Sequence, residues 1–207
     1  MDIIFSLAVL LFSVTVHEFA HGWMAYRLGD STAKDSGRLT LNPLKHLDPI
    51  GSFIVPLILF FISRLSGGGF IFGWAKPVPF NPDNLRDRRW GTAKVAAAGP
   101  SANLLIALVF GFALRFLPSQ FIPAGLTQIF SLIIFLNLLL AIFNSIPLPP
   151  LDGSKILFAF LPHSWRNLRI FLERYGMFLL LFLIFFAFQW ILPLIFFIYQ
   201  FIVGISV

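Results

Sequence analysis

Long apolar runs, separated by short polar segments, dominate the pattern along the chain. A helix needs about 20 mainly apolar residues to cross a bilayer. Four runs meet this length, at residues 3–28, 93–117, 125–147 and 175–204. Because most charged residues lie between these runs, we expect membrane-crossing helices that are joined by polar loops.

A fifth apolar run, at residues 50–63, is too short for a regular span. It contains Pro56 and ends at Arg64 before a glycine triplet, which favours a break in the helix. Lys and Arg are concentrated in the loops 29–49, 64–92 and 148–174, whereas the loop 118–124 is uncharged. The positive-inside rule places the basic loops in the cytoplasm, so residues 50–63 should enter and leave on one face as a re-entrant or interfacial segment.

Residues 38–41 and 70–79 are rich in β-forming side chains and are bounded by Gly or Pro, which predicts two short strands. We therefore expect an all-α polytopic membrane protein with about 4–6 transmembrane helices. A short membrane-associated β-sheet and the re-entrant segment should lie near its cytoplasmic side. Residues 1–207 should form a single transmembrane domain.

The composition strengthens the membrane assignment. Hydrophobic residues make up 58% of the chain, which has 27 Phe and a mean hydropathy of +0.87, outside the range of soluble domains. The net charge of +6 reflects topology, because no basic stripe with interleaved aromatic residues indicates nucleic-acid binding. The absence of Cys excludes thiolate ligands, so a metal would have to be held by His and carboxylate groups.

The strongest chemical signal is an H-E-x-x-H motif, His17-Glu18-Phe19-Ala20-His21, inside the first apolar run. Residues four apart share a helix face, so His17 and His21 can bind one metal, and Glu18 is placed to act as a general base. An ionisable group at the bilayer centre costs about 2.5–3.5 kcal/mol, which a metal would offset. A chance match and a proton relay are the alternative interpretations.

Two histidines need a third protein ligand, and Asp152 is the candidate. It follows three prolines in Pro147-Leu148-Pro149-Pro150, which prevent a regular helix and free backbone carbonyl groups. Such a bend calls for a polar or water-filled neighbourhood, where a carboxylate is tolerated. Alternatively, Asp152 caps the helix that follows Gly153.

Together these motifs resemble the site-2 protease family of intramembrane zinc metalloproteases (peptidase M50 type). That family joins H-E-x-x-H on one helix to an N-x-x-P-x-P-x-L-D-G-type motif, here residues 144–153, on a later helix. Residues 98–103 (A-G-P-S-A-N) and 72–78 match further elements of the family. The resemblance covers most of residues 10–160, with an extra Pro in the second motif, and implies a minimal form without PDZ or CBS domains.

The resemblance implies one Zn²⁺ per chain, held by His17, His21 and Asp152, with Glu18 as the general base. It further implies proteolysis of single-span membrane proteins near the cytoplasmic face of the bilayer. We expect a multi-pass protein of a bacterial or archaeal cytoplasmic membrane, with its active site towards the cytoplasm. The oligomeric state is left open.

Other polar residues receive more ordinary interpretations. Asn144 is a candidate donor to the oxyanion, although it could equally satisfy the helix end next to the prolines. Asn103 and Asn137 are expected to form interhelical hydrogen bonds. His46 and His163 lie in polar loops and are expected to be solvated.

A non-proteolytic membrane zinc carrier or sensor could use the same ligands and is the main functional alternative. Glu18 separates the two functions, because a carrier needs the histidines but has no use for a base beside them. A helical scaffold with accidental motifs would bind no zinc.

Overall fold

The computed structural model describes residues 3–55, 57–59, 61, 73–117 and 123–204. The α-helices are α1 (Ile3–Arg27), α2 (Thr32–Asp35), α4 (Gly91–Phe116), α5 (Ala124–Asn144), α6 (Asp152–Phe160), α7 (Arg166–Phe182) and α8 (Phe188–Val203). The shorter elements are the 3-10 turns η1 (Pro43–Lys45), η3 (Pro82–Asn84) and η5 (His163–Trp165), with the π-helical turns η2 (Pro49–Ile54) and η6 (Leu183–Ala187).

Three helices of the described chain are long and apolar enough to cross a membrane: Ile4–Arg27, Gly91–Phe116 and Gly125–Asn144. They coincide with three of the four predicted spans, so the helical, polytopic part of the expected fold agrees with the structure. The fourth predicted run, 175–204, falls within two helices, Arg166–Phe186 and Gln189–Val203, which are bent by 73°. Whether this bent pair crosses the bilayer once or twice stays a prediction.

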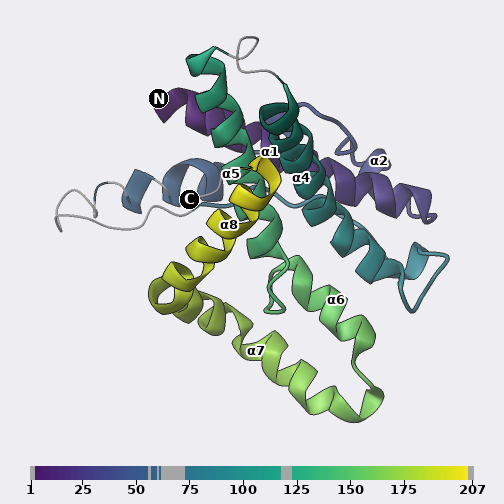
Figure 1. The fold of residues 1–207 in the computed structure, drawn as a ribbon. Coiled ribbons are helices and arrows are strands. Elements are labelled where there is room, and N and C mark those ends of the chain that lie inside the picture. The colour runs from purple at the N-terminus through teal and green to yellow at the C-terminus, as the bar shows by residue number, and fades with distance from the viewer. Residues whose placement is uncertain (1–2, 56, 60, 62–72, 118–122, 205–207) are drawn as a thin grey trace.

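The helices pack around α4 and α5, with α1 on one side and α8 on the other (Figure 1). A buried apolar cluster joins α4, α5 and α8: Ala107, Ile134, Leu138, Ile195, Ile202 and Val203. Close approach is possible because Gly111 of α4 has no side chain where the Cγ2 atom of Ile202 lies. A second cluster, formed by Ala25, Leu85 and Val95, ties the end of α1 to the start of α4.

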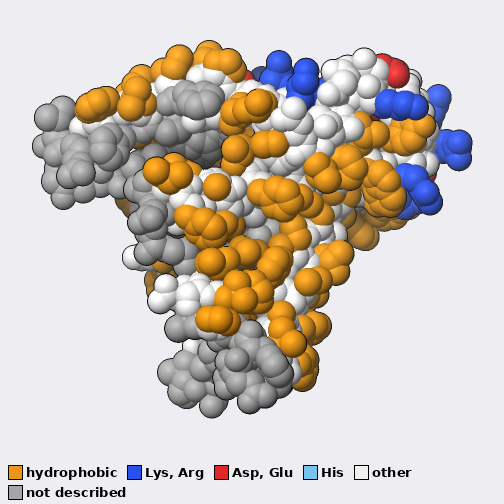
Figure 2. All heavy atoms as spheres, turned by 90° about the horizontal axis from the view of Figure 1, so that it is seen from above, with side chains coloured by type: hydrophobic (Ala, Val, Ile, Leu, Met, Phe, Trp, Pro, Cys, Tyr) orange, Lys and Arg blue, Asp and Glu red, His pale blue; other side chains and the backbone are white. Residues whose placement is uncertain are grey.

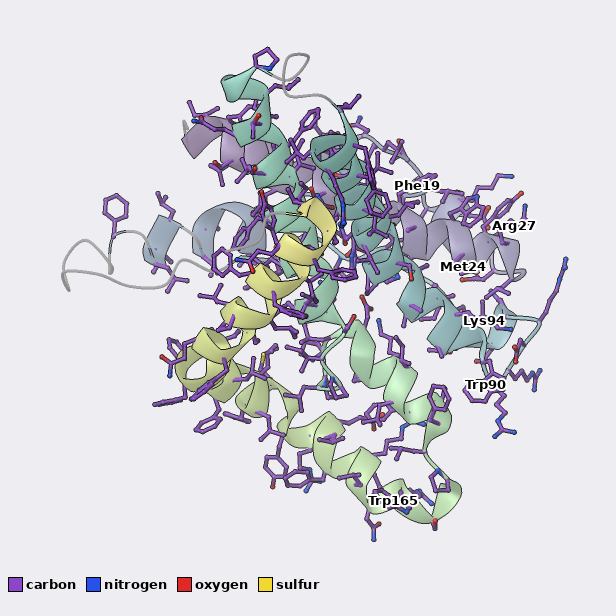
Figure 3. All side chains as sticks on the ribbon, viewed as in Figure 1. Phe19, Met24, Arg27, Trp90, Lys94 and Trp165 are labelled. Atoms are coloured by element: carbon purple, nitrogen blue, oxygen red, sulfur yellow. The ribbon has the colours of Figure 1, made fainter. Side chains whose placement is uncertain are left out.

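The outer surface is strongly apolar. Large hydrophobic side chains such as Phe116, Trp190 and Phe201 are at least 71% exposed, as expected for side chains that face lipid. Figure 2 shows hydrophobic side chains over much of one face, with Lys and Arg side chains gathered towards one end. Arg27, Trp90 and Lys94 lie at a common end of α1 and α4 (Figure 3).

The predicted re-entrant run, 50–63, begins as a helix in the structure. An apolar helix covers Pro49–Leu59 and is shorter than a membrane span. Gly51 in this helix packs against the indole ring of Trp74. Residues 62–72 lie outside the described chain, so the path of this run stays a prediction.

The predicted β-sheet is wrong, because the described residues contain no strand. Residues 39–41 form a bend, and residues 73–79 have no regular secondary structure and pair with no strand of the described chain; residues 70–72 of the second prediction lie outside the described chain. The amide groups of Trp74, Lys76 and Val78 donate instead to the Gly51 and His46 carbonyl groups and to Glu18. Pro77 and Pro79 offer no N–H for a β-ladder.

The expectation of a solvated His46 is also wrong. Its side chain is fully buried, and its Nε2 atom lies 2.8 Å from the Thr40 carbonyl oxygen. The loop between α1 and residue 50 therefore encloses this side chain instead of exposing it to solvent. The side chain of His163 lies outside the described residues.

Asp30 connects the end of α1 to the loop that precedes α4. Its buried carboxylate accepts hydrogen bonds from the Thr32 hydroxyl group (2.5 Å), the Asn81 amide (2.8 Å) and Asn84 Nδ2 (2.9 Å). Burial alone would raise the pKa of Asp30, but these hydrogen bonds outweigh it and hold the pKa below its ordinary value. The ionised form of Asp30 thus stabilises the fold.

We expect Asp30→Asn to lower the free energy of unfolding by about 1–3 kcal/mol at pH 7, because buried donors lose their charged acceptor. The folded-state pKa lies below the unfolded value, so this stabilisation is present above about pH 4 and is lost as the pH falls through the folded pKa. Thermal unfolding in detergent between pH 3 and pH 7 measures it. The exposed Asp83→Asn is the control, and equal stability of the two variants at pH 7 would contradict the assignment.

Candidate metal centre

Helix α1 presents His17 and His21 on the same face, one turn apart. Both side chains are buried, and their ring centroids lie 4.6 Å apart with an edge-to-face orientation of 84°. The spacing of four residues produces this arrangement in any regular helix. The Nε2 atoms of both histidines point towards Asp152.

Asp152 reaches the histidines from the bend between α5 and α6. Its Oδ2 atom lies 3.1 Å from His17 Nε2 and 3.0 Å from His21 Nε2. Asp152 is the first residue of α6, whereas Leu151 occupies the N-cap position, so Asp152 is not the N-cap residue and its carboxylate lies against the histidines. The structure thus brings together the three residues that the sequence nominated, and one ligand atom from each lies within 4.8 Å of the others.

The bend that delivers Asp152 depends on tight backbone packing. A Cβ atom on Gly153 would clash with the carbonyl oxygens of Ser145 and Ile146, so the start of α6 lies directly against the end of α5. Gly176 of α7 packs against Pro149, with its Cβ position 2.6 Å from the Pro149 carbonyl oxygen. The prolines and glycines therefore fix where α6 begins.

Both histidines are oriented through their second ring nitrogen. His21 Nδ1 lies 2.7 Å from the Val95 carbonyl oxygen, and His17 Nδ1 lies 2.5 Å from Asn103 Oδ1. A carbonyl oxygen can only accept, so each Nδ1 carries the hydrogen, and in the neutral imidazole Nε2 is then the nitrogen available to a metal ion. This is the usual support for a histidine that binds a metal.

The amide of Asn103 is itself held in one orientation. Its Nδ2 donates to the Ser13 carbonyl oxygen (3.1 Å) and to Asn137 Oδ1 (2.8 Å), while Asn137 Nδ2 donates to Ser13 Oγ (2.9 Å). The predicted interhelical hydrogen bonds of Asn103 and Asn137 are therefore confirmed. The sequence interpretation missed the contact between Asn103 and His17, although the A-G-P-S-A-N match was the signal for it.

Gly99 of α4 lies directly against the two imidazoles. A Cβ atom at this position would lie 2.5 Å from the Nε2 atoms of both His17 and His21. Two imidazoles and one carboxylate that converge in this way form a donor set that suits zinc. The residues present therefore fit a metal ion.

Glu18 lies beside this group on the next face of α1. It is half-buried, and its Oε2 atom accepts a hydrogen bond of 2.8 Å from the Val78 amide. The segment 73–79 thus contacts the predicted base through the Val78 amide. Asn144 donates to the Leu140 carbonyl oxygen of its own helix at 3.0 Å, so its role towards an oxyanion stays a prediction.

A family profile and several known proteins are similar to this chain in sequence. The sequence profile described as Peptidase family M50 matches residues 116–187. YwhC of Bacillus subtilis, named as a candidate zinc metalloprotease, is 41% identical over 185 residues, which cover 86% of this chain and 78% of that protein. Rip2 of Mycolicibacterium smegmatis, which carries the same description, is 35% identical over 150 residues, covering 69% of this chain and 52% of that protein. No solved structure matches the chain at comparable significance.

Gly99→Ala should reduce the bound metal at least tenfold while the protein remains folded, because the added methyl group would occupy the space between the imidazoles. Elemental analysis of detergent-purified protein measures the metal content. Gly125→Ala is the matched control, since a Cβ atom on this glycine of α5 meets nothing within 4 Å. A Gly99→Ala protein with the metal content of the wild type would show that the ion does not bind here.

Proposed function

Because the chain belongs to peptidase family M50, we propose that it is an intramembrane zinc metalloprotease of the site-2 protease type. It would hydrolyse peptide bonds within or near the transmembrane segments of other membrane proteins. The observation that carries this proposal is the meeting of His17, His21 and Asp152 in a buried group. Asp152 lies 135 residues after His17 in the sequence, and the three side chains are at most 10% exposed.

The ligand set supports one Zn²⁺ per chain. Catalytic zinc sites use three protein ligands and leave a position for water or substrate. His17 and His21 would bind through Nε2 and Asp152 through Oδ2, with Asn103 and the Val95 carbonyl holding the imidazoles in place. When bound, zinc supplies a Lewis acid that polarises a carbonyl group and makes a water molecule more acidic.

Glu18 would carry the proton transfers of peptide hydrolysis. Its carboxylate would accept the proton of the attacking water and return it to the nitrogen of the leaving amine. The Val78 amide fixes one carboxylate oxygen, which leaves the other free for this exchange. No covalent intermediate with the chain is required.

The position of the site supports cleavage inside a membrane. His21 lies six residues before Arg27, or about 9 Å along α1 from the charged end. The basic residues at this end favour the cytoplasmic side. We therefore infer a multi-pass protein of the cytoplasmic membrane, with its active site towards the cytoplasm and with single-span membrane proteins as substrates.

Glu18→Gln separates the protease from a zinc carrier or sensor. Since a general base contributes about 10²–10⁴-fold to the rate, this variant should lose at least 100-fold in cleavage of a single-span substrate while keeping its zinc. Cleavage by purified protein in lipid vesicles, together with zinc analysis, measures both properties. Glu173→Gln makes the same change at an exposed position of α7 and should behave as the wild type.

Two results would contradict the proposal. Undiminished cleavage by Glu18→Gln would remove the assigned base. A wild-type protein that contains zinc and transports it, but cuts no membrane-protein substrate, would favour the carrier.

A further inference from the structure

Lys155 lies one turn after Asp152 in α6, and its Nζ atom is 3.1 Å from Asp152 Oδ1. The two oxygens of this carboxylate therefore face different partners. Oδ2 lies against the two histidine Nε2 atoms, and Oδ1 lies against the lysine ammonium group. An ion pair three residues apart is common on helix surfaces, but here one member is a buried candidate ligand.

The lysine is held from a second side. Its Nζ atom lies 5.8 Å from the ring centroid of Phe80, a distance at which a cation is attracted to an aromatic face. Phe80 packs against the cluster formed by Ala25, Leu85 and Val95, so the ring is part of the framework that joins α1 to α4. The side chain of Lys155 is 38% exposed, whereas that of Asp152 is 9% exposed. The ammonium group therefore covers the outer side of the carboxylate.

We propose that Lys155 is a positioning residue that occupies Oδ1 of Asp152, so that this carboxylate offers only Oδ2 to the zinc ion. The inference rests on the proposed function, because it requires zinc at His17, His21 and Asp152. A carboxylate can bind a metal through one oxygen or through both. A cation at Oδ1 disfavours the second mode and keeps a coordination position free for the reaction.

Without this cation, Oδ1 can turn to the metal and raise the coordination number. Lys155→Met should therefore keep at least the wild-type zinc content, yet cleave more slowly, by about tenfold or more, as expected for loss of an outer-shell partner. Replacing zinc by Co²⁺ reports the coordination directly, because four-coordinate Co²⁺ absorbs visible light more strongly than five-coordinate Co²⁺. We expect weaker visible absorption per bound Co²⁺ in Lys155→Met than in the wild type.

Three further variants make the test specific. Lys155→Arg keeps a cation with hydrogen-bond donors and should restore the wild-type spectrum and most of the activity. Lys155→Gln removes the charge with a shorter polar side chain and gives the answer if the Met variant fails to fold. Lys94→Met is the matched control, because Lys94 also forms an ion pair, with Asp87 at 2.6 Å, and that pair includes none of the three candidate ligands.

The outcomes distinguish this inference from the proposed function. A wild-type protein that binds neither zinc nor Co²⁺ would overturn the proposed function and the inference with it. A metal-binding wild type whose Co²⁺ spectrum and activity are unchanged in Lys155→Met and Lys155→Gln would overturn the role of Lys155 alone. Weaker absorption in both neutral variants, with recovery in Lys155→Arg, supports it.

Discussion

Asp152 meets His17 and His21 where all three side chains are at most 10% exposed, and buried polar groups must satisfy one another. Each imidazole uses one nitrogen for an oxygen acceptor and turns the other towards the carboxylate. The arrangement leaves three ligand atoms converging on one small volume. An ion in that volume would offset the cost of placing three ionisable groups inside a membrane protein.

Glycine residues at the helix contacts allow Asp152 to lie close to the two histidines. Gly99 lets α4 approach the histidines, and Gly153 lets α6 start directly against the end of α5. Pro149 fits against Gly176, which connects the bend to α7. Helix α4 also supplies Asn103 and the Val95 carbonyl, so a single helix both packs closely against the two histidines and orients them.

Local sequence patterns were sufficient for the three long apolar helices and for the position of His17 and His21 on one face of α1. Apolar runs of span length can form little else in lipid, and histidines four residues apart share a face in any helix. Local patterns were not sufficient to predict features that depend on partners distant in the sequence. β-forming residues at 73–79 have no neighbouring strand in the described chain, and His46 is buried by a loop whose closure no local pattern indicates. The contact between Asn103 and His17 joins positions 86 residues apart, beyond the reach of helix periodicity.

Zinc K-edge X-ray absorption of the purified, detergent-solubilised protein tests the three-residue site most directly. The account predicts two imidazole ligands and oxygen ligands at about 2.0–2.1 Å, with no sulfur. One imidazole contribution should disappear in His21→Ala, and an oxygen contribution should change in Asp152→Ala. A spectrum without imidazole scattering, or one that neither substitution alters, would show that any bound zinc lies elsewhere and would contradict the account.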